Sequence, residues 1–545
     1  MTRHALIVLI GLALVAAVSC KSGDGTGIAP DPETAKAIEA AAAANADNPF
    51  FKPYGTTFDV PPFDQITNAH FLPAIEQGIR LERTEVDAIV ADRKKPTFEN
   101  TIAALDRAGI FLSEVNAVFG ALQGAHTNDE LQALARKTAP MLASHNDDIS
   151  LNEGLFARVK AVYDKRDKLE LGREELFLLE NTYKDFVRGG ALLDAAGKAR
   201  LRELNQELSL LSVKFGENVL GETNAFKLVI DKKADLAGLP PSVVAMAAAA
   251  AKQAGLPEGR WLFTIHVPSM TPFLTYSERR PLRESLHRAY FMKGDNGDER
   301  DNKENAVKIA RLRGEKARLL GYASHAAFVL ENNMAKTPER VDAFLKELWD
   351  PTLVKAREEA DALQALADRE LGAGKIEIAS WDWWYYAEKL RQEKYALDEE
   401  ALRPYFKLDN VRDGIFMLCE KLYGLKFVEL PDLPRYHPEV QVFEVREADG
   451  RPVGILYTDY FPRPTKGGGA WMNAFRDQSA PATRFSDREI AVLRLVGTDR
   501  RQVRRLVQAR RAGGRHALVQ STRAGTFGGS DQRTKDGSNH GDYGL

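Results

Sequence analysis

Apolar residues recur at every third or fourth position over the first half of the chain, from about Phe63 to Gly221, with polar residues between them. This spacing puts apolar side chains on one face of a helix, so it predicts successive amphipathic helices packed on one another. Residues 102–122, preceded by a Thr and an Asn that can cap them, and residues 200–219 are two long examples. The pattern predicts a mainly α protein.

The same spacing returns in the second half of the chain. We predict helices over residues 243–254, 283–292, 301–320, 338–371, 381–397 and 414–423. Cys419 lies within the last of these segments, where a buried and unreactive thiol is expected.

Short strands interrupt the helices in two places. Residues 226–230 and 261–267 are rich in β-branched and aromatic residues and predict a small sheet. Residues 440–447 alternate in polarity, turn at Asp449-Gly450, and continue over residues 453–460, which is typical of a β-hairpin.

Two features could carry chemistry but have a simpler structural explanation. His266 alternates with apolar neighbours in its predicted strand, which favours a hydrogen-bonded structural histidine over a metal ligand. The aromatic run at residues 381–386 could line a cleft, although aromatic residues at this density usually form core. We interpret both as structural.

Length and charge narrow the class of protein. The chain has 545 residues, of which 75 are basic and 77 acidic, for a net charge of −2. Such a balance gives no overall attraction for nucleic acid or an anionic membrane surface. The length predicts two or more lobes with a sizeable buried core.

The N-terminus has the features of an export signal. Arg3 precedes an apolar run over residues 5–18, and small residues lead to Cys20. This arrangement resembles a bacterial lipoprotein box, so we expect lipidation at Cys20 and anchoring of the protein to a membrane in the periplasm. A cleaved signal with an incidental cysteine is the alternative. Residues 21–47 are rich in Gly, Ala, Asp and Pro and predict a flexible tether.

The histidines do not form the helical zinc-binding pattern H-E-x-x-H, which needs two imidazoles four residues apart on one helix face. Ten histidines are spread along the chain, and no two have this spacing. No metal ligand is therefore assigned from the sequence.

Several segments, in order along the chain, share one resemblance. They are residues 270–283 (MTPFLTYSERRPLR), 288–294 (RAYFMKG), 316–322 (KARLLGY), 334–338 (MAKTP), 381–386 (WDWWYY), 457–464 (YTDYFPRP) and 468–471 (GGAW). Together they resemble the thimet oligopeptidase family of zinc metallopeptidases, and most closely its bacterial peptidyl-dipeptidases and oligopeptidase A-like members. The similarity runs from about Asn48 to Ser479.

The resemblance implies a mainly α, two-lobed, zincin-like body with a small β-hairpin or sheet and a deep channel for short peptides. It also implies peptide hydrolysis at one zinc ion and, for a complete member, a monomer. In the family the H-E-x-x-H helix, the further zinc-ligating glutamate and the oxyanion-stabilising residues follow the segment that matches residues 468–471. This chain shows no counterpart of them, so the catalytic lobe is expected to be truncated, no catalytic residue is assigned, and the chain is expected to be inactive.

One part of the family's channel does have a counterpart here. The segment from Tyr457 to Ala470 matches a region that borders the channel and offers main-chain groups to bound peptide. We therefore predict that Tyr457, Gly468, Gly469 and Ala470 bind substrate, because main-chain pairing is indifferent to substrate sequence.

These observations divide the chain into five parts. Residues 1–19 are the predicted signal, residues 20–48 the tether, and residues 49–240 an N-terminal helical lobe. Residues 241–479 are the first part of a peptidase catalytic domain, and residues 480–545 are a tail without the resemblance.

The tail has three candidate explanations. It is rich in arginine, and Lys535 is its one lysine, as expected if a GC-rich gene is read out of frame. A frameshift is the hypothesis that we favour. The second is a natural, non-catalytic peptide-binding lipoprotein. The third is a basic helix over residues 500–515 that binds nucleic acid or anionic lipid, but exported proteins rarely meet nucleic acid, and we expect no nucleic-acid partner.

Overall fold

A computed structural model describes residues 45, 47–397, 399–476 and 491–496, the last of these as backbone only. The predicted signal, Cys20 and nearly all of the predicted tether lie outside the described residues. So does the predicted tail, apart from residues 491–496.

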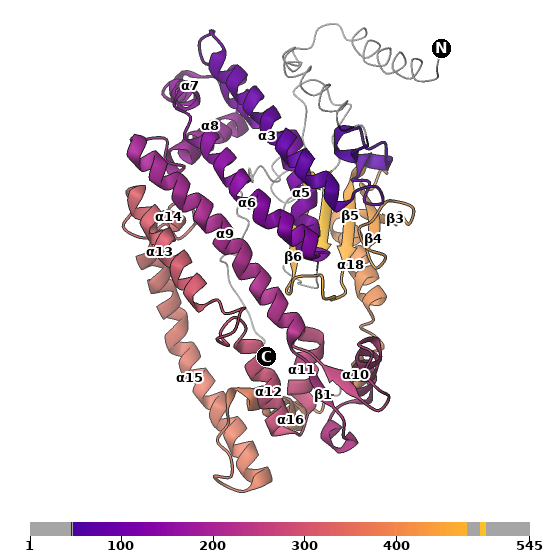
Figure 1. Cartoon of the computed structure of the whole chain (residues 1–545). Coiled ribbons are helices and arrows are strands. Elements are labelled where there is room, and N and C mark those ends of the chain that lie inside the picture. The colour runs from indigo at the N-terminus through magenta and orange to yellow at the C-terminus, as the bar shows by residue number, and fades with distance from the viewer. Residues whose placement is uncertain (1–44, 46, 398, 477–490, 497–545) are drawn as a thin grey trace, which may run out of the picture.

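A layer of long helices forms the N-terminal half, as the apolar spacing predicts (Figure 1). These are α3 (Asn68–Ala91), α5 (Ile110–Ala125), α6 (Asp129–Ser150) and α9 (Ala195–Ala225), with α7 (Glu153–Tyr163) and α8 (Arg173–Arg188) at one end. Helix α3 packs on α5 and α6, and α6 packs along α9. Their core is built on fully buried side chains such as Phe71, Ile75 and Phe119.

The single helix predicted over residues 102–122 is broken in the structure. A π-helical segment (Phe98–Ala103) and α4 (Ala104–Arg107) precede Gly109, and α5 begins only at Ile110. Gly109 has a left-handed φ of 77°, which L-residues rarely adopt. Its N–H donates to a Glu85 carboxylate oxygen at 2.7 Å. The apolar spacing continues across this break, which is why the periodicity did not reveal it.

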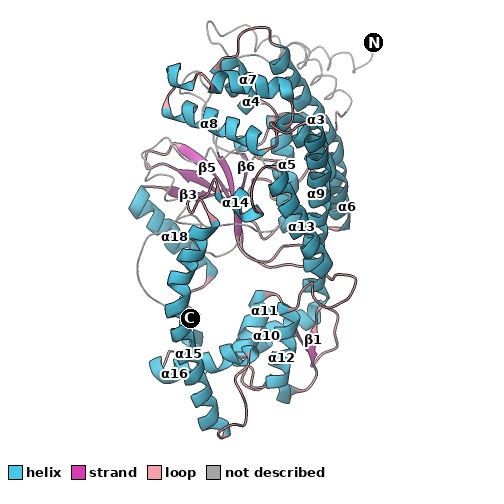
Figure 2. Cartoon of the chain, turned by 90° about the vertical axis from the view of Figure 1, so that its left-hand side faces the viewer, coloured by secondary structure: helices cyan, strands magenta, loops and turns pink. Residues whose placement is uncertain are grey.

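The opposite end of the molecule holds a second helical group and a small sheet. Strands β1 (Leu228–Ile230) and β2 (Trp261–Phe263) pair antiparallel, beside α10 (Pro241–Gln253), α11 (Val267–Tyr276), α12 (Arg280–Phe291) and α16 (Trp383–Tyr395). Phe263, Phe273 and Leu286 lie in their shared core. Figure 2 shows this group below the N-terminal layer, with α15 (Pro338–Leu371) extending towards it.

The strand predicted over residues 261–267 is shorter than expected, with only three residues. It ends at Phe263, and His266 is the N-cap residue of α11. Pro268 stands in the first turn of that helix, where proline's missing N–H and fixed φ favour helix initiation. His266 Nδ1 lies 3.1 Å from the Thr264 hydroxyl. No partner among the described residues reaches its buried Nε2, so the histidine is only half satisfied.

The remaining elements complete the chain. They are α13 (Lys303–Leu319), α14 (His325–Leu330), α17 (Glu399–Leu402), α18 (Leu408–Tyr423) and short 3-10 turns at Pro49–Phe51, Thr57–Asp59, Arg166–Lys168, Lys233–Leu236 and Ser380–Asp382. Cys419 is buried on α18 and free, as predicted.

A five-stranded sheet lies against the N-terminal layer, in the order β3-β4-β5-β7-β6. Its strands are β3 (Lys426–Glu429), β4 (Gln441–Arg446), β5 (Pro452–Asp459), β6 (Trp471–Arg476) and β7 (Ala491–Val496). The predicted hairpin is confirmed as β4 and β5, which pair antiparallel. Strand β7 runs parallel to β5, so residues of the predicted tail enter the middle of this sheet.

The predicted fold class is confirmed, because the described chain is mainly helical with two small sheets. The deep channel stays a prediction. Within the described ranges, none of the helices combines the length and the apolar character that crossing a bilayer requires.

Replacing Gly109 with alanine should destabilise the protein by about 2 kcal/mol or more, because a Cβ is strained at positive φ. That Cβ would also lie 2.3 Å from Glu82 Cδ. Glu82 is held in place at 2.9 Å from His145 Nε2. Urea unfolding of Gly109→Ala measures the loss. Gly216→Ala on α9, where a Cβ meets nothing within 4 Å, is the control and should not lower stability. Equal midpoints for Gly109→Ala and wild type would contradict the prediction.

Candidate functional site

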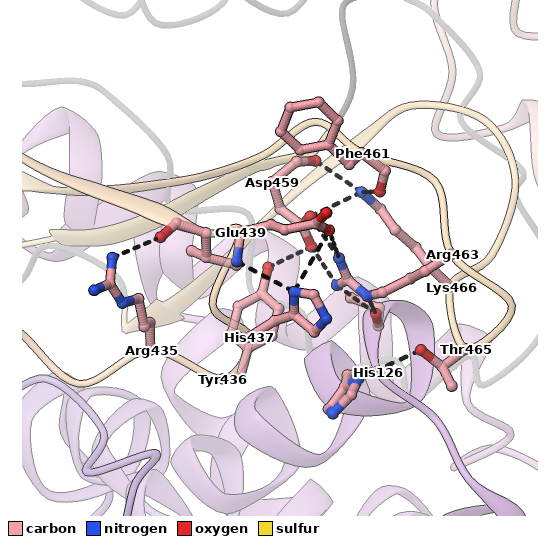
Figure 3. Close-up of polar contacts among 12 residues, drawn as sticks. His126, Arg435, Tyr436, His437, Glu439, Asp459, Phe461, Arg463, Thr465 and Lys466 are labelled. Atoms are coloured by element: carbon pink, nitrogen blue, oxygen red, sulfur yellow. Dashed lines mark hydrogen bonds and ion pairs between the residues drawn. The ribbon is translucent and has the colours of Figure 1, made fainter. Parts of the chain in front are cut away.

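A buried carboxylate organises the end of strand β5. Asp459 is 0% exposed and accepts hydrogen bonds from two cationic side chains (Figure 3). Arg463 donates from Nη1 at 2.9 Å and Nη2 at 2.6 Å, and Lys466 donates from Nζ at 3.0 Å. The Tyr436 hydroxyl adds a fourth bond at 2.8 Å. The carboxylate oxygens are therefore surrounded by donors.

These contacts fix the charge state of Asp459. Burial alone raises the pKa of the carboxyl, but hydrogen bonds from Arg463, Tyr436 and Lys466 outweigh it and hold the pKa at about 2. The carboxylate is ionised at neutral pH, and its two cationic neighbours compensate the buried negative charge.

The same network fastens the loop after β5 to the end of helix α5. Arg463 Nε and Nη2 donate to the Ala125 carbonyl at 2.9 and 2.6 Å. The N–H of Gly467 donates to the Gly124 carbonyl at 2.8 Å, and that of Thr127 to the Thr465 carbonyl at 2.8 Å. Carbonyls at a helix C-terminus lack partners within the helix and carry partial negative charge, so an arginine is well suited to them.

Two histidines from distant segments meet beside this loop. The rings of His126 and His437 are 5.3 Å apart, edge to face. His126 Nδ1 lies 3.3 Å from the Thr465 hydroxyl, and His437 Nδ1 accepts the N–H of Glu439 at 3.3 Å. Burial, followed by the charges of His437 and Arg463, lowers the pKa of His126, so this imidazole is neutral at pH 7.

The structure separates the four predicted substrate residues. Tyr457 is fully buried, donates to the Pro434 carbonyl at 3.0 Å, and packs against the rings of Phe63 and Phe475. Its backbone lies in β5, between β4 and β7, so neither edge of that strand is free. Tyr457 offers a ligand neither a side chain nor an open strand edge.

Gly468, Gly469 and Ala470 lie at the surface, directly before the edge strand β6. Added Cβ atoms at Gly468 and Gly469 would meet nothing within 4 Å, so the loop can be approached closely from outside. Gly469 has a φ of 93°, which explains the glycine there. The structure thus brings these three residues together directly before β6, the last strand in the order of the described sheet.

The aromatic run at residues 381–386 is structural, as predicted. Asp382 is 0% exposed and is bound by Arg280 at 2.8 Å and by Arg283 at 2.7 Å. Tyr386 is buried in the core where α15 meets α16. The run joins α16 to α12.

Sequence reasoning missed Asp459, Arg463 and Lys466 as a functional group of residues. Their segment was noticed only for its resemblance. The acid and the arginine are four residues apart, but this spacing indicates an ion pair only on a helix, and the segment is the end of a strand and a loop. Nothing in the sequence could place Tyr436 or the Ala125 carbonyl beside them.

Comparison with known proteins shows which protein family this chain is similar to. Residues 273–502 match the sequence model of the family described as "Peptidase family M3". These residues are similar to the peptidase domain of family M3, which confirms the resemblance read from the sequence. The match continues past residue 479 into the arginine-rich segment.

Individual relatives agree with this assignment. Dipeptidyl carboxypeptidase of Salmonella typhimurium is 39% identical over 433 residues, or 79% of this chain and 63% of that protein. The Escherichia coli dipeptidyl carboxypeptidase is 38% identical with the same coverage. Oligopeptidase A of Escherichia coli is 31% identical over 445 residues, or 81% of this chain and 65% of that protein. The chain thus spans about 63% of the length of the first two relatives.

Peptidases of this family depend on zinc, and the described residues do not fit that ion. Zinc needs three or four converging nitrogen, oxygen or sulfur ligands. No such group of His, Cys, Asp or Glu side chains occurs in the part of the chain that the structure describes. Asp459, the buried carboxylate nearest the two histidines in Figure 3, is already bound by two cations and a phenol.

Asp459→Asn should destabilise the protein by about 3–5 kcal/mol, because it leaves two buried cations without their counter-charge. The folded-state pKa near 2 lies below the unfolded value of about 3.9. The stabilisation is therefore fully present above about pH 4 and is lost as the pH falls through about 2. Unfolding free energies of wild type and variant should converge over this range.

Asp449→Asn is the matched control for that substitution. Asp449 pairs with Arg451 in the exposed turn between β4 and β5, and an exposed pair contributes at most about 1 kcal/mol. Equal losses in the two variants would show that the buried network does not hold the loop.

Proposed function

We propose that this chain functions as a relative of the M3 peptidases, which hydrolyse short peptides with zinc, and that the chain as given binds peptides without cleaving them. The support for the first half is similarity to two dipeptidyl carboxypeptidases over 79% of the chain. The support for the second half is the donor set, which offers no zinc ligands among the described residues and no H-E-x-x-H pattern in the sequence.

The edge strand β6 is the observation that carries peptide binding. Among the described strands it pairs with β7 alone, and an added Cβ at Gly468 or Gly469 would meet nothing within 4 Å. An extended peptide can add to such an edge through main-chain hydrogen bonds alone, which suits an enzyme family acting on varied short peptides. The loop before β6 is fastened to α5 at Gly467, so the edge is held in position before a peptide arrives.

A non-catalytic peptide-binding lipoprotein is the second candidate function, and the same open edge favours it. In this proposal the protein is exported, carries a lipid on Cys20 and presents β6 to peptides in the periplasm. Arg3, the apolar run over residues 5–18 and the small residues before Cys20 support the export step. Lipidation of Cys20 can be tested by measuring the mass of protein purified from a host that lipidates exported proteins.

The purified chain should not cleave a fluorogenic short peptide in the presence of zinc, whereas Escherichia coli dipeptidyl carboxypeptidase should cleave it under the same conditions. The physical reason is that a zinc peptidase activates water on a metal held by three protein ligands, and the described residues provide no such set. Cleavage by the chain that a chelator abolishes and zinc restores would overturn the proposed inactivity.

Gly468→Leu should weaken the binding of a short extended peptide at least tenfold, because its side chain projects into the open approach to β6. Gly468 lacks a positive φ and its Cβ would meet no neighbour, so the substitution should leave stability unchanged. Fluorescence anisotropy of a labelled peptide measures the affinity. Gly216→Leu on α9, equally free of neighbours, is the control and should bind like wild type. Unchanged binding by Gly468→Leu would exclude this edge as the peptide site.

A further inference from the structure

Two main-chain hydrogen bonds, one on each side of His126, bind the loop that follows β5 to the end of helix α5. Each is 2.8 Å long, and they run from the Gly467 N–H to the Gly124 carbonyl and from the Thr127 N–H to the Thr465 carbonyl. His126 itself is the C-cap residue of α5. We call residues 124–127 and 465–467 the α5 joint. It lies directly before Gly468, at which peptide binding is proposed.

The side chain of His126 belongs to the same joint. Its Nδ1 lies 3.3 Å from the Thr465 hydroxyl, so the imidazole bridges the two segments that the main-chain bonds connect. In Figure 3 this ring points towards Thr465, and the ring of His437 lies beside it, with 5.3 Å between centroids. His126 is half-buried, so it packs against the loop while solvent can still reach it. A change in its charge therefore acts at the joint.

The titratable groups around His126 come from three parts of the chain. The segment before β4 supplies Tyr436, His437 and Glu439, β5 and its loop supply Asp459, Arg463 and Lys466, and the first turn of α6 supplies Asp129 and Glu130. The two α6 carboxylates are exposed, and Glu130 accepts a hydrogen bond from Asn68 at 2.7 Å. His126 thus faces an arginine and a second histidine, while the Asp459 carboxylate is already bound by two cations.

These surroundings favour the neutral imidazole. Burial lowers the pKa of His126 most, His437 and Arg463 lower it further, and Asp459 acts in the opposite direction. Since the pKa in the closed joint lies below the ordinary value of about 6.5, an open joint binds the proton more tightly. The closed joint is therefore fully favoured above about pH 6.5 and loses stability as the pH falls through the lowered pKa.

His437 adds to this effect through a change of hydrogen-bond partner. Its Nδ1 accepts the N–H of Glu439 at 3.3 Å, which only an unprotonated nitrogen can do. A protonated Nδ1 must donate instead, and the Glu439 carboxylate lies 3.6 Å away. Protonation thus exchanges one bond for the other and places a positive charge beside the His126 ring. Two charged rings at this distance repel each other.

We propose that His126 is a positioning residue for the peptide site at β6, and that protonation of His126 loosens the α5 joint and weakens peptide binding. Arg463 and Lys466 still hold the base of the loop on Asp459, so the loop stays near α5 but loses its fixed place. A peptide must then order the loop as it binds, which costs affinity. The effect on affinity rests on the proposed peptide binding at β6, whereas the loosening of the joint does not.

Peptide affinity measured from about pH 7.5 to about pH 5 tests the proposal on the full chain. The probe is an end-capped peptide without titratable side chains, carrying a label whose fluorescence is independent of pH, so only the protein changes charge. The wild-type affinity should fall about fivefold or more, since a pKa difference of one unit corresponds to about tenfold in affinity. His126→Gln keeps a neutral side chain that can bond to Thr465, so its affinity should match wild type at the higher pH and stay constant.

His287→Gln on α12 is the matched control. Burial lowers the pKa of His287 as well, but this histidine packs against Phe291 and Trp384 in the helical group at the opposite end of the molecule. Its variant should keep the pH dependence of wild type, and circular dichroism should show the same fold for all three proteins at both ends of the pH range. A wild-type affinity that does not change with pH, or a dependence that His126→Gln retains, would overturn the proposal.

Hydrogen exchange reports the joint without any peptide. After correction for the intrinsic pH dependence of exchange, protection of the Gly467 and Thr127 amides should fall about fivefold or more over the same pH range in wild type, but not in His126→Gln. Unchanged protection in wild type would contradict the proposal even if peptide affinity depends on pH. Absence of peptide binding at every pH would instead contradict the proposed function, and the exchange would still decide whether His126 controls the joint.

Discussion

The buried carboxylate of Asp459 is the constraint on which the candidate site depends. It terminates β5 inside the protein, where an ionised group is tolerated only with compensating charge and hydrogen bonds. Arg463 and Lys466 provide that charge from the loop that follows. Since Arg463 also binds the Ala125 carbonyl, the carboxylate joins the sheet to the helical layer. The loop cannot leave α5 without exposing or unpairing a buried ion.

This constraint explains how a glycine-rich loop can be both open and well placed. The N–H of Gly467 is bound to the Gly124 carbonyl. The Trp471 ring packs beside Gly124, so that an added Cβ on Gly124 would lie 3.5 Å from the ring. Between these anchors an added Cβ at Gly468 or Gly469 would meet nothing within 4 Å, so a short stretch of the loop leaves room for a ligand. Most of the conformational entropy of the loop is already lost when the protein folds. Less of it remains to be lost when a peptide binds.

The helices and the hairpin could be predicted because their signals are local and periodic. The errors arose where one residue changes the backbone without changing polarity, as Gly109 does between α4 and α5 and Pro268 does before α11. Tyr457 was chosen from resemblance, but a strand in the middle of a sheet has no free edge. The Asp459 network was out of reach, because Tyr436 and α5 approach it only through the tertiary fold.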